Sequence, residues 1–264
     1  MAGDSAVNHE IDTGARIRIS QPFVAQRVHG DHDVRPALCI ILPVLNEAPT
    51  LEERLRALQA MRKRGARVVV VDGGSDDDTL SIARQHADLA FLAPRGRASQ
   101  MNAGAAACPA DILLFLHADT LLPSSADVLV ARALRGPRQW GRFDVRLDSR
   151  RPALRLVETL MNVRSRWTGI ATGDQAMFVR YEAFQEAGAF PDIPLMEDVV
   201  MSKRLKKLSP PACLRQRVVT SARRWERYGI WRTVLLMWRL RLAFFFGADP
   251  NKLAVQYGYQ IPSR

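Results

Sequence analysis

Two uninterrupted apolar runs constrain the fold of this chain more than any other feature. Residues 68–71 read VVVV and residues 112–116 read ILLFL, with no polar residue between the apolar ones. Strands buried on both faces have this composition, which is typical of parallel sheets covered by helices. A third apolar run at 38–42 and helical patterns at 50–62 and 79–86 complete a strand–helix alternation. The series predicts an α/β fold with a Rossmann-like, mostly parallel sheet flanked by helices.

The pattern becomes less regular after Pro137, where we expect strands at 140–147 and 176–180 and helices at 153–166 and 198–208. We therefore divide the chain into three regions. Residues 1–36 form a loosely ordered arm without the apolar core of a signal peptide. Residues 37–228 form the main domain, with halves at 37–120 and 121–228. Residues 229–264 form an apolar, basic helical segment.

Charge is distributed unevenly along the chain. Residues 1–134 carry a net charge of −2 and residues 135–264 carry +13, which gives the chain its net +11. This imbalance indicates an anionic partner: a phosphate-bearing small molecule, a nucleic acid or an acidic membrane surface. A nucleic acid is not expected, because the basic residues are not interleaved with a recognisable nucleic-acid module.

The three cysteines bear on the compartment. Cys39, Cys108 and Cys213 are odd in number and never in a CxxC spacing, so neither a disulfide framework nor a structural zinc site is indicated. With no signal peptide, this composition predicts a cytoplasmic protein.

Polar residues follow the first two predicted strands, where sheets of this class bind ligands. The first strand runs into Pro43, Asn46 and Glu47, and the second ends at Asp72 before two glycines and Ser75. An acid in this place can accept hydrogen bonds from a ribose or a base edge, and the glycines allow close approach. The alternative is that the acids at 77 and 78 only cap the next helix.

Two later segments add charge to the same edge. Arg95 and Arg97 lie in a glycine-containing loop and can clamp a diphosphate, although two arginines can also be a solvated surface. His117 and Asp119 follow the third strand and point to the same side of an extended chain. Because Mg²⁺ and Mn²⁺ prefer oxygen ligands, Asp119 is the stronger metal ligand. His117 is either a weaker ligand or a hydrogen-bonded pocket residue.

Together these motifs resemble those of the family-2 glycosyltransferases with the GT-A fold. The resemblance extends over residues 38–225, and the FLHADT, GDQAMF and PLMEDV motifs look most like a small bacterial subgroup. The matching positions are Pro43, Asn46, Glu47, Asp72, Gly74, Ser75, Asp77, Thr79, Asn102, Gly104, Asp119, Glu197, Asp198, Arg224 and Trp225.

The resemblance implies an enzyme that transfers a sugar from a nucleotide-diphosphate sugar to an acceptor hydroxyl, with inversion. Asp198, beside Glu197, would be the catalytic base, and Asp119 would bind Mn²⁺ or Mg²⁺. Acceptor-binding residues would be Asp174, Gln175 and Trp225. The nucleotide-sugar site would comprise Pro43, Asn46, Glu47, Asp72, Ser75, Arg97, Asn102, His117 and Arg224.

For several of these residues a purely structural role is the alternative. Glu197 and Asp198 are also favourable as ordinary acids at a helix N-terminus. The segment containing Asp174 and Gln175 reads equally as a turn, and Trp225 as a surface anchor.

Three positions depart from the family pattern. Gly73 replaces the second acid after the second strand, His117 replaces the first acid of the D-x-D motif, and Ser221 replaces the Gln of the Q..RW motif. Strict metal dependence therefore stays open, and a processive polysaccharide synthase is not expected. A catalytically inactive, membrane-associated nucleotide-sugar-binding protein is the main alternative. A dinucleotide oxidoreductase is disfavoured, because no GxGxxG follows the first strand. The sugar, nucleobase, acceptor and oligomeric state stay open.

The segment 229–246 is the most apolar in the chain, but Arg232, Arg239 and Arg241 interrupt it, so it is not expected to span a bilayer. As a helix it would lie in the interface of an anionic membrane, which would place the enzyme on the inner face of the cell membrane, with a lipid-linked acceptor as one option. Packing against the back of the α/β domain is the alternative. The apolar surface would comprise Ile230, Trp231, Leu235, Trp238, Leu242 and Phe245.

Overall fold

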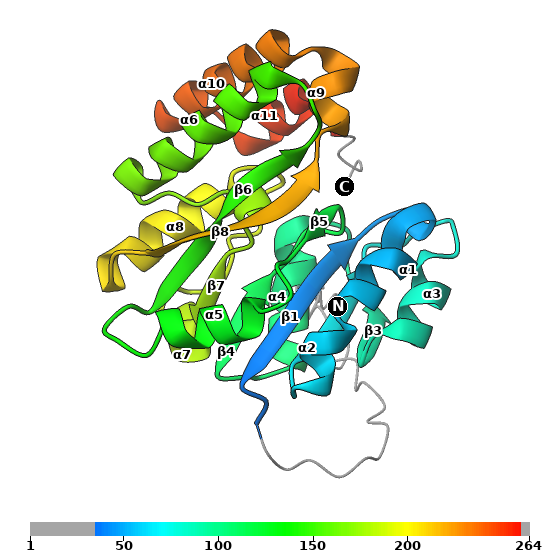
Figure 1. Cartoon of the computed structure of the whole chain (residues 1–264). Helices are drawn as coiled ribbons and strands as arrows, with labels where there is room; N and C mark the ends of the chain where they lie inside the picture. Colours follow the sequence, from blue (N-terminus) through cyan, green and yellow to red (C-terminus); the bar gives the residue numbers. More distant parts are fainter. Residues whose placement is uncertain (1–34, 260–264) are drawn as a thin grey trace, which may run out of the picture. The chain divides into compact units, whose positions relative to one another are not determined.

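The computed structural model describes residues 35–259, so nearly all of the predicted arm at 1–36 lies outside the described part. The described residues group into one compact unit. Its centre is an eight-stranded sheet with the strand order β3-β2-β1-β4-β7-β6-β8-β5, flanked by helices (Figure 1). The predicted α/β class is therefore confirmed.

The first half of the sheet is wholly parallel. β1 lies between β2 and β4, and β3 is added beside β2. The predicted strands and helices of this half are present, except that the helix expected at 50–62 is broken into two at Leu58. The elements are β1 (Leu38–Val44), α1 (Ala48–Ala57), α2 (Gln59–Lys63), β2 (Arg67–Asp72), α3 (Thr79–His86), β3 (Leu89–Leu92), α4 (Arg97–Ala107) and β4 (Ile112–Phe115).

The second half mixes strand directions. β7 is antiparallel to both β4 and β6, β6 is parallel to β8, and β5 is antiparallel to β8. The elements are β5 (Thr120–Leu121), α5 (Ala126–Ala133), β6 (Trp140–Asp148), α6 (Pro152–Thr168), the 3-10 turn η1 (Gly173–Gln175), β7 (Phe178–Arg180), α7 (Tyr181–Glu186), α8 (Glu197–Leu208), β8 (Ala212–Ser221), α9 (Arg223–Tyr228), α10 (Ile230–Phe245) and α11 (Pro250–Tyr257).

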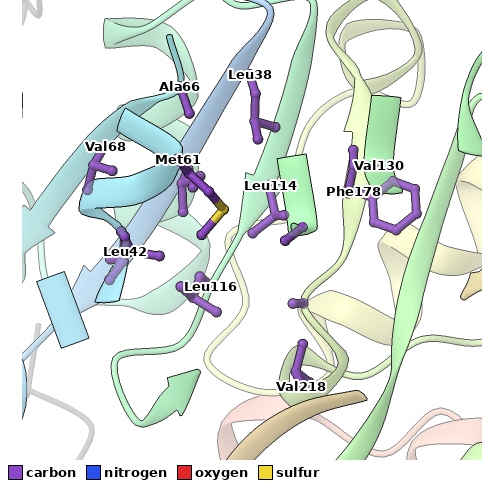
Figure 2. Packing of buried hydrophobic residues seen from close by; sticks show 14 of the residues in the cluster. Leu38, Leu42, Met61, Ala66, Val68, Leu114, Leu116, Val130, Phe178 and Val218 are labelled. Carbon is purple, nitrogen blue, oxygen red and sulfur yellow. The ribbon is translucent and has the colours of Figure 1, made fainter. Parts of the chain in front are cut away.

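Alternate residues of β1 pack into two separate cores, because successive side chains of a strand point to opposite faces. Leu38 and Leu42 pack with Met61 of α2 and Val130 of α5 on one face, which Figure 2 shows. Ile41 packs on the other face, in a cluster with residues of α4, α7 and α8. Helices therefore cover both faces of β1, as the uninterrupted apolar runs predict.

The contact of α4 with the sheet depends on a glycine. A Cβ atom on Gly104 would lie 2.5 Å from Cγ2 of Ile41 and 3.1 Å from Cγ2 of Val71. Only a residue without a side chain allows this approach. The close packing fixes the helix whose first residue is Arg97.

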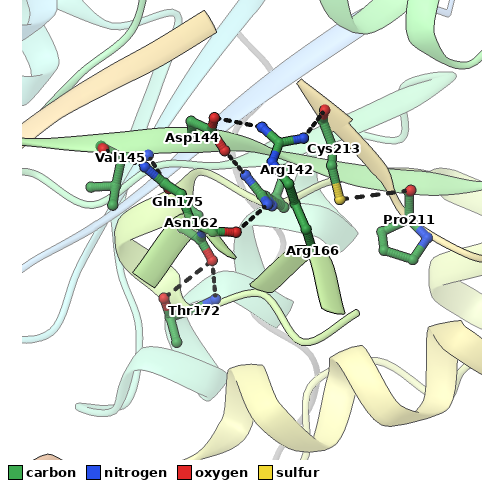
Figure 3. A network of polar contacts seen from close by, with 9 residues as sticks. All are labelled: Arg142, Asp144, Val145, Asn162, Arg166, Thr172, Gln175, Pro211 and Cys213. Carbon is green, nitrogen blue, oxygen red and sulfur yellow. Dashed lines mark hydrogen bonds and ion pairs between the residues drawn. The ribbon is translucent and has the colours of Figure 1, made fainter. Parts of the chain in front are cut away.

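A buried polar network joins α6 to β6 (Figure 3). The fully buried Arg142 pairs with Asp144, whose other oxygen accepts from Arg166 of α6 at 2.5 Å. Asn162 of α6 accepts from the backbone N–H of Val145 at 2.9 Å and donates to its carbonyl at 3.0 Å. The inner face of α6 is thus fixed by hydrogen bonds and ion pairs.

The C-terminal helices α9 and α10 pack beside α6. Leu154 and Val157 of α6 form a buried cluster with Trp225 of α9, against which Ile230 and Val234 of α10 are packed. The expected helix at 229–246 is therefore present, and one of its faces is packed against the domain. Between residues 35 and 259, no helix combines the length and the apolar character needed to cross a bilayer.

Candidate functional site

Asp72 lies at the carboxyl end of β2 and is fully buried. Its Oδ1 accepts hydrogen bonds from the backbone N–H groups of Gly74 and Ser75 at 2.9 and 2.8 Å, and from the Ser75 hydroxyl at 2.8 Å. Its Oδ2 is buried without a partner among the described residues. Buried polar atoms normally have a hydrogen-bond partner. This oxygen is therefore suited to accept a hydrogen bond from a ligand.

The loops after β1 and β2 are tied together beside Asp72. The Asn46 backbone N–H donates to the Ser75 hydroxyl at 2.9 Å, and the Asn46 side-chain oxygen accepts from the Asp76 N–H at 2.9 Å. Asn46 adopts a φ of 53°, a left-handed conformation that asparagine tolerates better than most residues. Pro43 lies within β1, in register with Val71. These contacts hold the edge of the sheet in one conformation.

Asp77 has the capping role that was the structural alternative. Its carboxylate accepts from the Thr79 N–H at 3.0 Å and from the Ala48 N–H at 3.2 Å, at the first residues of α3 and α1.

Burial raises the pKa of the nearby Glu47 carboxyl, and Asp119 and Asp77 raise it further, while Arg223 opposes the shift. Glu47 follows β1 and Asp119 follows β4, so both acids lie at the carboxyl edge of the parallel strands.

A pocket of about 70 Å³ brings together motif residues that are far apart in the sequence. Arg97 comes from the start of α4 and His117 from the turn after β4. Asp174 comes from η1, and Glu197 and Asp198 from the start of α8.

The carboxylate of Asp198 is fixed in place. Its Oδ2 accepts from the Gly173 N–H at 2.9 Å, and its Oδ1 accepts from the Val199 N–H at 2.7 Å. Met196, just before the two acids, has a φ of 72°. Such a conformation is costly for a non-glycine residue and is found preferentially at functional sites.

Glu197 differs from its neighbour in being buried. Burial, followed by the nearby charge of Asp198, raises the pKa of Glu197 to about 7. A carboxyl that titrates near neutrality can take up or release a proton under physiological conditions. The pocket therefore contains two adjacent acids in different environments.

His117 and Asp174 form a second pair in the pocket. The His117 Nδ1 lies 3.6 Å from the Asp174 Oδ1. Although burial would raise the pKa of Asp174, His117 and the charges of Arg97 and Arg241 hold it below its usual value. A Cβ atom on Gly173 would lie 2.2 Å from the His117 ring, so the ring packs directly on this glycine.

Three residues expected in the site make structural contacts instead of lining this pocket. Asn102 exchanges two hydrogen bonds with the backbone of Phe190, at 2.9 and 3.0 Å. Gln175 is buried and closes a capping box with Thr172, which agrees with the turn alternative. Trp225 is buried in the cluster beneath α6.

Arg224 is held by the C-terminal helix. Its guanidinium donates to the Tyr257 carbonyl at 2.7 Å and stacks 3.6 Å from the centre of the Tyr257 ring. Arg97 lies 5.7 Å from the ring centre of Tyr259. Tyr257 also lines the pocket, so the aromatic residues at the end of α11 position cationic groups next to it.

The residues around Asp119 can contribute only part of a metal site. No group of three His, Cys, Asp or Glu side chains with metal-binding geometry occurs within residues 35–259. Asp119 contacts the hydroxyls of Thr120 and Thr220 through Oδ1, and His117 faces Asp174. Mg²⁺ is commonly bound by one or two carboxylates together with substrate phosphates and waters. A metal ion at Asp119 would therefore need further ligands from a bound diphosphate and water.

Sequence reasoning missed the apolar wall of the pocket. Met161 of α6 and Met237 and Leu240 of α10 line it, together with Arg241 and Tyr257. Methionine and leucine at helical spacing look the same whether they face a core or a pocket, so no sequence signal distinguished them. Arg241 was noted only as a charge within an apolar segment.

The chain is similar to known proteins of one family. The profile of Glycosyl transferase family 2 matches residues 39–185, more than half of the chain. Uncharacterized glycosyltransferases of Mycobacterium tuberculosis and Mycobacterium bovis are 38% identical over 84 residues, which cover 31% of this chain and 37% of theirs. The aligned segment thus spans little more than a third of those relatives.

Solved structures share the fold at low sequence identity. The mannosyltransferase PcManGT of Pyrobaculum calidifontis, in complex with GDP-Man and Mn²⁺, aligns with a TM-score of 0.58 at 22% identity, over 86% of this chain and 70% of its own. S. aureus TarS 1–349 aligns with a TM-score of 0.58 at 17% identity, over 70% and 60%. Glucosyl-3-phosphoglycerate synthase from Mycobacterium tuberculosis aligns with a TM-score of 0.52 at 20% identity, over 70% and 71%. These neighbours identify the fold as GT-A. With the family profile matching over most of the parallel half and into the pocket, this chain belongs to glycosyl transferase family 2.

Proposed function

We propose that this glycosyltransferase transfers a hexosyl group from a nucleotide-diphosphate sugar to an acceptor hydroxyl, with inversion at the anomeric carbon. One observation carries the proposal: Arg97, His117, Asp174, Glu197 and Asp198 line the same pocket. The related fold binds GDP-Man with Mn²⁺ in PcManGT, and UDP-GlcNAc in TarS.

The donor would lie along the carboxyl edge of β1, β2 and β4. The Oδ2 of Asp72, which has no partner within residues 35–259, would accept a hydrogen bond from the nucleoside, beside Asn46 and Ser75. Arg97 and Arg224 would lie at the diphosphate, because guanidinium groups form forked, charge-assisted hydrogen bonds with phosphate oxygens. Their stacking on Tyr259 and Tyr257 restricts where the guanidinium groups can move.

Asp119 would hold a divalent metal ion jointly with the diphosphate. When bound, Mn²⁺ or Mg²⁺ would neutralise charge on the departing nucleoside diphosphate. His117, which replaces an acid of the family pattern, would line the pocket beside Asp174.

In the transfer step the bond from the anomeric carbon to the diphosphate oxygen breaks while the acceptor oxygen attacks from the opposite face. Asp198 would take the proton of the acceptor hydroxyl, because its carboxylate is fixed by the Gly173 and Val199 N–H groups and has further lone pairs free. Glu197, with a pKa of about 7, would tune the charge next to this base. Asp174 would hydrogen-bond acceptor hydroxyls.

The location expected from the sequence stays part of the proposal. We propose that the protein is peripheral at the inner face of the cell membrane, where the outer side of α10 contacts lipid and the acceptor is found. The chain spans about a third of the uncharacterized relatives that it matches, so the sugar and the acceptor have to be identified by experiment.

Asp198→Asn tests the proposal. Purified protein would be incubated with a panel of nucleotide sugars and a cell extract, and the products identified by mass spectrometry. The variant should lose about 10²–10⁴-fold in transfer rate, which is the usual contribution of a general base. Its donor affinity, measured by calorimetry, should change little, because the base acts on the acceptor.

Asp192→Asn is the matched control, since Asp192 is exposed in the loop before α8. Wild-type turnover in Asp198→Asn would remove Asp198 from the role of base. Donor binding without turnover in the wild type, across the whole panel, would instead support the inactive nucleotide-sugar-binding protein.

A further inference from the structure

The outer face of α10 is an uninterrupted apolar row. Its members recur every three or four residues, so they lie on one side of the helix. Each is between 60% and 71% exposed, although each is large and apolar. The row comprises Trp231, Leu235, Trp238, Leu242 and Phe245.

A second apolar row lies on α6, which the sequence did not indicate as a surface element. Leu156, Leu160, Val163 and Trp167 are spaced by three or four residues and are exposed by 44% to 88%. The inner face of the same helix carries the polar network with Arg142 and the buried Leu154 and Val157. The solvent-facing side of α6 therefore carries a row of apolar residues, whereas its domain-facing side includes polar contacts.

The two helices are neighbours. Val157 of α6 and Ile230 and Val234 of α10 share one hydrophobic cluster, and Figure 1 shows the helices together at one end of the sheet. We call the two exposed rows, nine residues in all, the α6–α10 face. Monomeric soluble proteins rarely expose large apolar patches without an interaction to explain them.

Arginines border both rows. On an ideal helix, Arg232 and Arg239 lie to one side of the α10 row and Arg241 to the other, each roughly a quarter turn away. On α6, Arg155 and Arg166 lie to one side of the row, where they pair with Glu158 and Asp144, so the exposed arginines of this face belong to α10. The acid within these two helices is Glu158, which is buried and bonded to the Leu147 N–H. The apolar row of α10, with arginines on both of its sides, matches the acyl chains and anionic headgroups of a lipid surface.

Residues of these same helices line the pocket. Met161 of α6 and Met237 and Leu240 of α10 line it together with Asp174 and Asp198. An acceptor can therefore contact the acids with its hydroxyl and the two helices with an apolar portion.

We propose that the α6–α10 face lies on an anionic lipid bilayer and that the acceptor is an amphiphile taken from that bilayer between α6 and α10. This inference rests on the proposed transferase function and specifies the class of its acceptor. It assigns α6 an equal part with α10 in membrane contact.

A second copy of this chain is the competing occupant. Pairing two such faces would bring together Arg232, Arg239 and Arg241 of each copy, with no exposed acid on either helix. Juxtaposed like charges disfavour such an interface, whereas anionic headgroups neutralise them. The charges therefore favour lipid.

The tryptophans provide a direct test. Trp167, Trp231 and Trp238 are exposed and all belong to the α6–α10 face, whereas Trp140 and Trp225 are buried. The purified full-length chain would be mixed with phosphatidylglycerol–phosphatidylcholine vesicles whose acyl chains are brominated, which quenches nearby indoles. Trp231→Phe combined with Trp238→Phe leaves Trp167 as the exposed reporter. The fluorescence of Trp167 in this variant is expected to be quenched by the brominated lipid. If only the wild type is quenched, α6 does not contact the bilayer.

Substitutions on α6 test the same point by vesicle sedimentation. Leu156→Gln combined with Leu160→Gln should weaken binding to phosphatidylglycerol vesicles by about tenfold or more, because two apolar side chains lose their burial. Leu92→Gln combined with Val128→Gln is the matched control, since both residues are exposed apolar residues elsewhere on the molecule. Equal loss in both variants, no vesicle binding at low salt, or a dimer in sedimentation velocity that the α6 variant dissociates would each overturn the proposal.

The acceptor class has its own readout. With an isotope-labelled donor, the label should enter an organic-soluble product when the enzyme is given a cell lipid extract. Label entering only products of the water-soluble extract would overturn the amphiphilic acceptor and leave the proposed function intact. Failure of the proposed function would appear differently, as no transfer to either extract.

Discussion

At the scale of single residues, the two adjacent acids of the pocket differ in what holds them. Asp198 is fixed by two backbone N–H groups, whereas Glu197 is buried beside it with a pKa of about 7. An ordinary glutamate titrates near 4.5. Between these two values the folded protein keeps a proton that the unfolded chain has lost. The free energy of unfolding should therefore fall as the pH rises from about 4.5 to 7.

Glu197→Gln should remove this loss, because an amide does not ionise. Relative to the wild type, the variant should gain up to about 3 kcal/mol above pH 7, from 1.36 kcal/mol per pKa unit, and nothing below pH 4.5. Urea denaturation at pH 4.5 and at pH 8 measures the difference. Glu53→Gln is the control, since Glu53 is exposed on α1. A gain that is the same at both pH values would show that the effect does not arise from titration of Glu197.

At the scale of secondary structure, the parallel half was predictable from the sequence. Strands with helices on both faces need apolar residues at every position, and the runs at 68–71 and 112–116 show this directly. β8 was not predicted, because Arg215, Gln216 and Arg217 in its middle are exposed and obscure the pattern. The half-buried edge strand β3 gave a similarly weak signal.

The candidate site was predictable only on its polar side. The motifs indicated Asp72, Arg97, Asp174 and Asp198. Helical periodicity could not show that the apolar row of α6 is exposed or that Met237 and Leu240 of α10 line the pocket. Which face of an amphipathic helix is covered depends on its neighbours, and the polar network with Arg142 lies against α6 where a core would be expected.

The packing of α4 on the sheet yields a prediction at this scale. Gly104→Ala should destabilise the protein by about 1–3 kcal/mol, because the added Cβ would overlap Ile41 in a core that is packed from both sides. Gly136→Ala is the matched control, since a Cβ there would meet no atom within 4 Å. Urea unfolding midpoints compare the two. A midpoint for Gly104→Ala at or above the wild type would show that α4 can move away from β1.

At the scale of the whole molecule, the donor site is expected to report its ligand through stability. A nucleoside diphosphate that binds the folded state at a hundred times its Kd should stabilise it by about 2.7 kcal/mol. Thermal denaturation with UDP or GDP, each with Mn²⁺, should raise the Tm for one nucleotide more than for the other. Adding EDTA, or Asp119→Ala, should remove most of the shift. An undiminished shift in both cases would exclude a metal ion held by Asp119.

The order of the strands also has a consequence for how the chain acquires its native structure. All strands that pair with β1, β2 and β3 lie within residues 38–115, and so does one of the two strands that pair with β4. These strands can therefore pair while later residues are still being synthesised. β5 pairs only with β8 in the described sheet, through contacts such as the 3.0 Å hydrogen bond between the hydroxyls of Thr120 and Thr220. Closing so long a loop is slow. Because Asp119 adjoins this contact, the residue that we propose as the metal ligand would reach its final place only after β8 has been synthesised. The edge formed by Asp72 and Asn46 could fold earlier.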